Sequence, residues 1–183
     1  MSDKIFFATT NENKLREARE ILGTGIEGIK IGVDEIQTLN PEKCAVKKAA
    51  EIYKQCQKPI LVEDTALLFE AWKGLPGVFI DYFMKTVGNE GLLKMLEEEE
   101  NRGAVAQTTL VLCRGENDYQ IFTGVLEGTV ADKPRGEHGF GWDPIFIPNG
   151  FDKTLAEMST KEKNDISTRR KALEQLRRAV LFS

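Results

Sequence analysis

Apolar residues along the chain follow two spacings, and their order predicts an α/β protein. Short apolar runs, which are typical of buried strands, occur at residues 4–9, 26–33 and 60–62. Apolar residues with helical spacing fill residues 15–22 and 45–53 between these runs. The first third of the chain therefore reads as strands that alternate with helices.

The middle of the chain predicts a long β-hairpin. Ala104–Cys113 and Tyr119–Val130 are rich in β-branched and aromatic residues, and Gly115–Asp118 has the composition of a turn. Two short helices, Ile80–Thr86 and Gly91–Glu98, are expected before this hairpin. A βα alternation followed by a hairpin implies a mixed sheet rather than a purely parallel one.

Two adjacent carboxylates, Glu63 and Asp64, follow the third apolar run. We expect them at the carboxyl end of a buried strand, where open α/β sheets bind ligands, although Leu67–Phe69 either continues this strand or begins another. Successive side chains of a strand point to opposite faces, so one of the two should face a given site, and we assign the chemistry to Asp64. The alternative is that both carboxylates cap or solvate a loop.

A polar segment joins the first expected strand directly to the first expected helix, and it contains Thr9, Thr10, Asn11 and Lys14. A helix N-terminus directs backbone N–H groups and the positive end of its dipole at one spot, which suits a phosphate. Hydrogen bonds from the polar side chains and the charge of Lys14 would add to such a site. The P-loop glycines are absent, and the alternative is a plain capped helix.

The residues Asn40, Pro41 and Glu42 form a strong helix start, with an N-cap, a proline at the first helical position and an acid in the first turn. Glu42 has two interpretations. It interacts favourably with the helix dipole, or it is a second carboxylate for a metal ion shared with Asp64. Mg²⁺ is typically held by one or two carboxylates, waters and substrate phosphates, so this pair would suffice.

The loop Gly136–Pro144 is unusual because it combines three glycines with two aromatic residues. Gly141 and the other glycines allow a close backbone approach to a ligand, while Phe140 and Trp142 offer flat faces to a nucleobase. Asp143 adds a carboxylate that would bind the edge of the base. The alternative is a glycine-rich turn whose aromatic side chains fill the core.

The C-terminal part predicts a short capped helix followed by a final helix that Ser167 caps. Lys163 and Arg169 lie near the starts of these two elements, where they either bind a ligand or are solvated charges. The segment 161–178 contains seven Lys or Arg against three Asp or Glu. Basic charge is therefore local, as a single polyanionic ligand would require.

Composition excludes several classes of protein. The 183 residues are expected to form a single domain over residues 1–183. A net charge of −4 with a pI near 5.3 argues against a general nucleic-acid binder, because such proteins need excess positive charge to bind phosphates. His138 is the single histidine, which argues against multi-histidine metal sites and most Ser-His-Asp hydrolases. Three scattered cysteines and the lack of a signal peptide or membrane-length apolar run predict a cytoplasmic protein with no membrane partner.

Taken together, the motifs resemble those of the inosine triphosphate pyrophosphatases, and the resemblance covers nearly the whole chain. Five blocks carry it: Thr9–Lys14; Glu63–Thr65 with Gly74–Gly77; Phe140–Pro144; Glu157–Met158 with Glu162–Asn164; and Ser167–Leu173. Each block alone is unspecific, whereas their order and spacing are specific. The resemblance implies an elongated α/β fold with a long curved mixed sheet, flanking helices and two lobes around a central cleft, usually as a homodimer.

The resemblance also implies an activity and its site. Non-canonical purine nucleoside triphosphates such as ITP, dITP and XTP would be hydrolysed with Mg²⁺ to the nucleoside monophosphate and pyrophosphate, which removes them from the nucleotide pool. Asp64 would bind the metal or activate the attacking water, and Glu42 would complete the metal site. The segment Thr9–Lys14 would hold the phosphates with Thr65, while Lys163 would add positive charge or contact the nucleotide.

The base would lie by Phe140–Asp143 and meet Arg169, a cationic donor that favours a 6-keto purine over adenine. One departure is Thr168, because the family usually has histidine between this serine and arginine. Threonine reaches less far than imidazole, so we expect weaker rejection of canonical purines or a water-bridged contact. Two alternatives remain open: a related pyrophosphatase for pyrimidine or modified triphosphates, and a catalytically silent nucleotide-binding regulator.

Overall fold

The computed structural model describes residues 4–23 and 25–181, which group into two compact units. The first unit contains the described residues up to Thr65, the segment Thr108–Gly124 and the described residues from Arg169 onward. The second unit contains Ala66–Gln107 and Val125–Thr168. Each unit has its own hydrophobic core.

Seven strands of the described chain form one mixed sheet in the order β2-β1-β3-β5-β6-β7, with β4 paired to β3. The strands are β1 (Ile5–Ala8), β2 (Ile26–Ile29), β3 (Ile60–Phe69), β4 (Pro76–Gly77), β5 (Gly103–Cys113), β6 (Tyr119–Val130) and β7 (Phe146–Pro148). β1 is parallel to β2 and β3, whereas β3–β4 and β6–β7 are antiparallel. The expected mixed α/β fold, including the hairpin strands, is confirmed.

Six α-helices accompany the sheet in the described chain. They are α1 (Glu12–Leu22), α2 (Pro41–Cys56), α3 (Ile80–Thr86), α4 (Gly88–Met95), α5 (Thr160–Ile166) and α6 (Thr168–Leu181). Asn11 caps α1 by accepting hydrogen bonds from two backbone N–H groups, and Asn40 caps α2, with Pro41 as its first residue. Of the helices described, none is long and apolar enough to cross a bilayer.

Three elements expected from the sequence have wrong boundaries. Glu63 and Asp64 lie in the middle of β3 rather than at its carboxyl end, because the apolar residues that follow continue the strand as far as Phe69 and pair with β4. β2 ends at Ile29, and α4 begins and ends three residues earlier than expected. Polar residues within an otherwise apolar run therefore did not end the strand.

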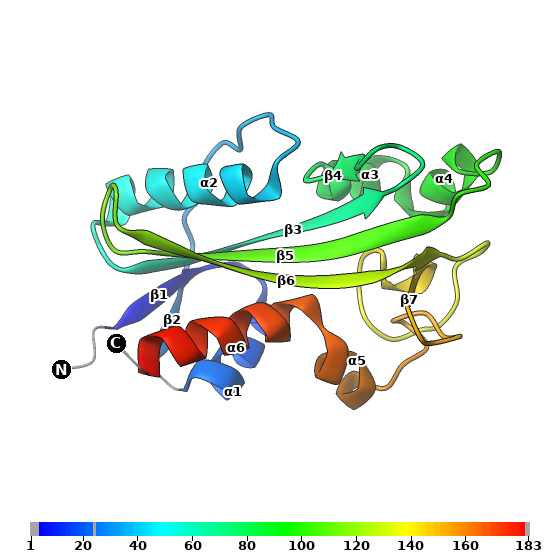
Figure 1. Ribbon diagram of the computed structural model, residues 1–183. Coiled ribbons are helices and arrows are strands. Elements are labelled where there is room, and N and C mark those ends of the chain that lie inside the picture. Colours follow the sequence, from blue (N-terminus) through cyan, green and yellow to red (C-terminus); the bar gives the residue numbers. More distant parts are fainter. Residues whose placement is uncertain (1–3, 24, 182–183) are drawn as a thin grey trace. The chain divides into compact units, whose positions relative to one another are not determined.

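In the first unit, α2 covers one face of the sheet and α1 and α6 cover the other (Figure 1). A hydrophobic cluster lies on each of these two faces. Phe7 and Leu61 pack with α1 and α6 on one face, while Ile60 and Val62 pack with α2 on the other. Odd-numbered residues in this part of β3 thus face α1 and α6, and even-numbered residues face α2, as strand geometry requires. This alternation decides which surroundings Glu63 and Asp64 meet.

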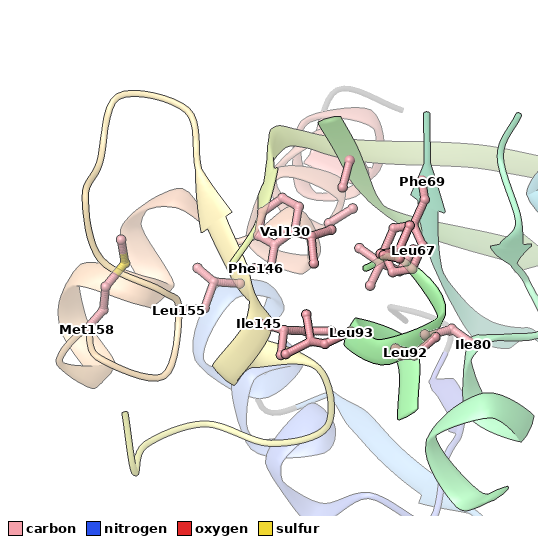
Figure 2. Packing of buried hydrophobic residues seen from close by; sticks show 13 residues of the cluster. Leu67, Phe69, Ile80, Leu92, Leu93, Val130, Ile145, Phe146, Leu155 and Met158 are labelled. Carbon is pink, nitrogen blue, oxygen red and sulfur yellow. The ribbon is translucent and has the colours of Figure 1, made fainter. Parts of the chain in front are cut away.

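The second unit is built on one large cluster, shown in Figure 2. Leu67 and Phe69 of β3 pack there with Leu92 and Leu93 of α4 and with Phe146 of β7. Further apolar side chains come from the segment after β7, and they are Leu155 and Met158. Burial of these side chains fixes the backbone on both sides of the glycine-rich loop.

Candidate active site

The parallel register of β1 and β3 brings Thr9–Lys14, the segment expected to bind phosphates, next to Glu63. Ala8, the last residue of β1, pairs with Val62 of β3, so the chain that leaves β1 continues beside Glu63. The ammonium of Lys14, on the first turn of α1, lies 2.8 Å from Glu63 Oε1. Lys14 and Glu63 are therefore held together by sheet register rather than by closeness in sequence.

The turn between β1 and α1 is ordered by its own side chains. Thr9 Oγ1 accepts a hydrogen bond from the backbone N–H of Asn11, and Asn11 Oδ1 accepts from the N–H groups of Asn13 and Lys14. Thr10 is exposed at the bend. The capped helix that the sequence allowed as an alternative is thus present. The same turn leaves the Thr10 hydroxyl exposed at the helix N-terminus.

Glu63 is the centre of a buried ion-pair network on the α1 and α6 side of β3. Only 6% of this residue is exposed, and its carboxylate accepts two hydrogen bonds from Arg169, at 2.8 Å from Nε and 3.1 Å from Nη2. Arg169 Nη1 also donates to Glu17 at 2.8 Å, and Thr65 Oγ1 donates to Glu63 at 3.4 Å. Burial acts to raise the pKa of Glu63, but Arg169 and Lys14 outweigh it and lower that pKa to about 2.

Asp64 points to the opposite face of β3 and meets a different set of residues. One oxygen from each of Asp64 and Glu35 and the sulfur of Cys44 all lie within 4.8 Å of one another. Lys48 Nζ lies 2.5 Å from Glu35 Oε1 and 4.0 Å from Asp64 Oδ1. Burial raises the pKa of Asp64 to about 6, with Glu35 and Glu63 acting in the same direction against Lys48 and Lys14.

Glu35 reaches this cluster because of the segment between β2 and α2. Ile29, Ile31 and Val33 are partly buried against the cluster of apolar side chains under α2, and Glu35 is the next residue of this alternating series. Glu35 and Lys48 were not among the site residues expected from the sequence. The alternation of apolar residues along this segment indicated that the side chain of Glu35 lies on the same side as those of Ile31 and Val33. Glu42 is not in the group of metal-ligating side chains found among the described residues, and its Oε1 accepts a hydrogen bond from Thr123 at 3.4 Å.

The side chains around Asp64 fit a divalent cation. Asp64 is only 9% exposed, and within the described chain its Oδ2 is buried without a hydrogen-bond partner. An unpartnered carboxylate oxygen in such a place is costly unless a cation or water satisfies it. Two carboxylates match the preference of Mg²⁺ for oxygen ligands. Burial, together with Asp64 and Glu35, raises the pKa of Cys44 to about 11. Sulfur is in any case a poor ligand for Mg²⁺, a hard ion that takes oxygen ligands.

In the second unit, the carboxylate of Asp143 organises the glycine-rich loop. Asp143 is only 3% exposed, and its Oδ2 accepts a hydrogen bond from the backbone N–H of Phe140 at 2.7 Å. The same oxygen lies 2.5 Å from Lys163 Nζ. Its carboxylate therefore fixes the loop conformation and holds Lys163 against it.

The two aromatic residues of this loop have different surroundings. Trp142 is partly buried, packs against the core of the second unit and contacts Phe146 edge-on, with ring centroids 5.6 Å apart. Phe140 is 48% exposed, and Lys163 Nζ lies 4.5 Å from its ring centroid. Gly141 has a φ of +61° and its carbonyl accepts a hydrogen bond from Asn89 at 3.0 Å. Trp142 therefore fills the core, as the second sequence interpretation expects, whereas the ring of Phe140 lies at the surface.

The residue that departs from the family pattern, Thr168, is buried at the start of α6, with 9% of its surface exposed. Arg169 follows it directly and carries the bidentate contact to Glu63. Burial acts to lower the pKa of Arg169, but Glu63 and Glu17 outweigh it and raise that pKa further. Its guanidinium is thus a permanent cation whose orientation two carboxylates fix.

Comparison with known proteins connects these features to a family. The model of the Ham1 family matches residues 5–179 of the chain. An inosine triphosphate pyrophosphatase of Yarrowia lipolytica is 47% identical over 177 residues, with 94% of this chain and 93% of the relative covered. A dITP/XTP pyrophosphatase of Hyperthermus butylicus is 43% identical over 175 residues, with 94% and 92% covered.

Solved structures agree with the sequence matches. The structure of a HAM1 protein from Coxiella burnetii has a TM-score of 0.89 and 32% sequence identity, and 98% of each chain is covered. The Staphylococcus aureus Ham1 protein has a TM-score of 0.86 and 27% identity, with 97% of this chain and 98% of that chain covered. The resemblance to the inosine triphosphate pyrophosphatases is confirmed, and the chain belongs to the Ham1 family.

Proposed function

We propose that this protein hydrolyses non-canonical purine nucleoside triphosphates, such as ITP, dITP and XTP, to the nucleoside monophosphate and pyrophosphate. The single observation that carries the proposal is the cluster around the buried Asp64, in which two carboxylates adjoin a lysine and one oxygen of Asp64 has no partner within the described chain. The names of relatives more than 40% identical to the chain support the substrate class.

Glu35 and Asp64 are the residues that would hold a divalent cation, and Mg²⁺ suits their oxygen ligands. When bound, the ion would neutralise phosphate charge and lower the pKa of a coordinated water. Without a bound ion the pKa of Asp64 is raised to about 6, and a bound cation would lower it, which favours the ionised carboxylate. Asp64 would then bind the ion or accept a proton from the attacking water. Lys48, a cation between Glu35 and Asp64, would stabilise negative charge on the triphosphate.

The phosphate chain would be bound by the turn between β1 and α1. The proposal assigns this role to Thr9, Thr10, Asn11, Lys14 and, from β3, Thr65. Lys14 keeps its ion pair to Glu63 while 22% of its side chain stays exposed, so its ammonium is both fixed and accessible. A fixed cation costs little reorganisation when charge develops on the leaving pyrophosphate.

The base would be bound by the loop of the second unit. Phe140 offers an exposed ring for stacking, Gly141 a close backbone approach, and Trp142 anchors the loop in the core. The base-binding roles proposed for Asp143 and Lys163 act through their mutual ion pair, which positions the loop. Positive charge from Lys163 over the Phe140 ring would favour an electron-rich carbonyl on the base.

Arg169 would donate to the 6-keto oxygen of the base, which presents an acceptor where adenine presents an amino donor. Its ion pairs with Glu63 and Glu17 fix the guanidinium before a ligand arrives. A mismatched buried polar pair costs about 1 to 3 kcal/mol, which is enough for discrimination between bases. The side chain at position 168 would then tune this selectivity.

Replacing Thr168 with histidine should therefore increase the preference for ITP over GTP. Imidazole reaches further than the threonine hydroxyl, so the variant regains a donor that rejects the wrong purine. The measurement is the ratio of kcat/KM for ITP to that for GTP in the native chain and in Thr168→His. An unchanged ratio removes the argument, and Thr168→Ser serves as the control that keeps a short hydroxyl.

The proposal gives the loop a structural requirement at Gly139. A Cβ at this position would lie 2.3 Å from Asp143 Oδ2, and φ is +82°. Gly150 has a φ of +84°, but nothing lies within 4 Å of the equivalent Cβ, so alanine there introduces the backbone strain without the clash. Gly139→Ala should raise KM for ITP at least about tenfold, which corresponds to 1.4 kcal/mol of lost binding. Gly150→Ala should leave KM unchanged, and equal KM values in the two variants would contradict the role of Asp143.

We extend the proposal to a cytoplasmic homodimer, as the family resemblance implies. Light scattering of the purified protein measures its mass, and a mass of one chain, 20.5 kDa, would contradict a dimer. The residues proposed to bind the metal and the nucleotide all belong to one chain. A monomer would therefore contradict the dimer without contradicting hydrolysis.

The function is tested by pyrophosphate release from ITP, XTP, dUTP, GTP and ATP with Mg²⁺. We expect release from ITP and XTP to exceed release from the canonical triphosphates. Preferred release from dUTP would indicate the related pyrimidine pyrophosphatase instead. Binding of ITP without release would indicate a silent nucleotide-binding regulator, and Asp64→Asn gives the background for each substrate.

A further inference from the structure

The proposed metal site contains a sulfur atom that the Mg²⁺ chemistry does not use. Cys44 Sγ belongs to the same group of ligand atoms as Glu35 and Asp64, all within 4.8 Å of one another. Mg²⁺ takes oxygen ligands, whereas Zn²⁺ and Cd²⁺ bind thiolates strongly. The three side chains therefore offer a different set of ligands to a thiophilic ion than to Mg²⁺.

We propose that Glu35, Cys44 and Asp64 form a three-ligand site for a thiophilic divalent cation such as Zn²⁺, which competes there with the activating Mg²⁺. The inference rests on the proposed function for the identity of the activating ion. It goes beyond that function by assigning Cys44 a ligand role and by giving the active site a metal-dependent inhibitor.

The geometry around Asp64 supports the site independently of the thiol. Asp64 is nine-tenths buried, and its Oδ2 has no hydrogen-bond partner in the part of the chain described. Two ligands of one zinc ion, at bond lengths of about 2.0 to 2.3 Å, lie no more than about 4.5 Å apart. Small side-chain rotations are thus enough to bring the three atoms onto one ion.

The position of Cys44 makes it a ready ligand. It is buried with 2% exposed on the first turn of α2, and the neighbouring Ala45 packs into the core that α2 forms with β3. Burial of the α2 face fixes the backbone of Cys44, so its sulfur needs little ordering when the ion binds. Glu35, by contrast, lies on an irregular segment and can adjust to the ion.

Binding exchanges one bond to hydrogen for one bond to metal. The S–H bond of Cys44 breaks, its proton passes to solvent and the sulfur electron pair forms the Zn–S bond, with no change of oxidation state. The Zn²⁺ charge offsets the two carboxylates, and Lys48 Nζ, now 2.5 Å from Glu35, neutralises part of the charge that the thiolate adds. Three protein ligands leave one zinc position open, as in catalytic zinc sites.

The test uses a variant in which Cys44 is the remaining thiol. Cys56→Ser and Cys113→Ser remove the other two of the three cysteines. Cd²⁺ titrated into this double variant should produce a sulfur-to-metal charge-transfer band in the ultraviolet, and added Cys44→Ser should abolish it. Zn²⁺ affinity, from competition with a chromophoric chelator, should fall at least about tenfold in Cys44→Ser, while Mg²⁺ affinity changes little.

A second variant keeps the test decisive if Cys44→Ser fails to fold. Glu35→Gln changes an exposed residue and leaves the thiol in place, and it should weaken Zn²⁺ binding at least about tenfold as well. Absence of the band in the double variant, or Zn²⁺ affinity that is insensitive to both changes, overturns the inference. If the same preparation still releases pyrophosphate from ITP with Mg²⁺, the proposed function stands. A band without pyrophosphate release overturns the function and leaves the zinc site intact.

Discussion

Asp64→Asn should abolish hydrolysis and at the same time make the protein more stable at pH 8. Loss of activity should be on the order of a thousandfold, because the variant lacks the carboxylate that we propose to bind the metal or accept the water proton. Stability should increase by about 3 kcal/mol, since a pKa raised from 3.8 to about 6 costs about 1.4 kcal/mol per unit when the buried group ionises. The carboxylate proposed for catalysis thus lowers the stability of the native protein at this pH.

The gain in stability of Asp64→Asn over the native chain should increase with pH. Below pH 3.8 Asp64 is protonated in both the folded and the unfolded state, so its carboxyl costs nothing. As the pH rises toward about 6, the unfolded state releases the proton first and the folded state loses its relative stability. The stabilising effect of Asp64→Asn should therefore be absent below pH 4, grow through this window and level off above it.

Urea unfolding of both proteins at pH 3.5, 5 and 8, with a chelator to remove divalent ions, measures the difference. Asp81→Asn is the matched control, because Asp81 is exposed and its ion pair with Lys85 lies on the surface. We expect the control to change the free energy of unfolding by less than about 0.5 kcal/mol at every pH. Destabilisation by Asp64→Asn at pH 8 would contradict the assigned surroundings of Asp64.

Glu63→Gln should have the opposite effect on stability. Glu63 is the shared partner of Lys14 and Arg169 in a buried network, and removing one partner leaves buried charge poorly compensated. Such changes cost about 3 to 5 kcal/mol. The loss should lower Tm by roughly 6 to 20 °C for a chain of this size. Hydrolysis should also weaken, because Lys14 and Arg169 lose their fixed positions.

The pH dependence of this second variant separates it from a general packing defect. Glu63 has a pKa lowered from 4.5 to about 2, so its ion pairs stabilise the native protein fully above pH 4.5, and that stability is lost as the pH falls toward 2. The difference between the native chain and Glu63→Gln should therefore shrink in this acidic range.

Differential scanning calorimetry of Glu63→Gln tests the expectation against Glu20→Gln. Glu20 pairs with Arg16 at 3.9 Å on the exposed face of α1, where an ion pair contributes about 0 to 1 kcal/mol. A loss below about 1 kcal/mol in Glu63→Gln, similar to the control, would show that the buried network contributes little to stability.

The sequence was sufficient where a local signal decided the structure. Asn11 and Asn40 cap their helices because their short side chains accept hydrogen bonds from backbone N–H groups of the first turn, which have no partner within the helix. The strands of the long hairpin follow from their β-branched residues and the turn between them. Alternation along β3 correctly separated the surroundings of Glu63 from those of Asp64.

The sequence was insufficient where tertiary pairing decided the structure. The strand β3 continues past Glu63 and Asp64 because Lys14 and Arg169 on one side and Lys48 on the other compensate these buried charges. The contacts of Arg169 with Glu63 join residues 106 positions apart, and no local sequence pattern predicts such a pairing. The same holds for the pairing of Asp143 with Lys163, which gives a residue assigned to the base a role in holding the loop.

The central claim is that the activating metal ion is held by Asp64 together with Glu35, rather than with Glu42. The most direct measurement compares pyrophosphate release from ITP, as a function of Mg²⁺ concentration, in Glu35→Gln and Glu42→Gln. The account predicts that Glu35→Gln loses at least about a hundredfold in activity and requires more Mg²⁺, whereas Glu42→Gln keeps most of its activity. The reverse result, an active Glu35→Gln and an inactive Glu42→Gln, would contradict it.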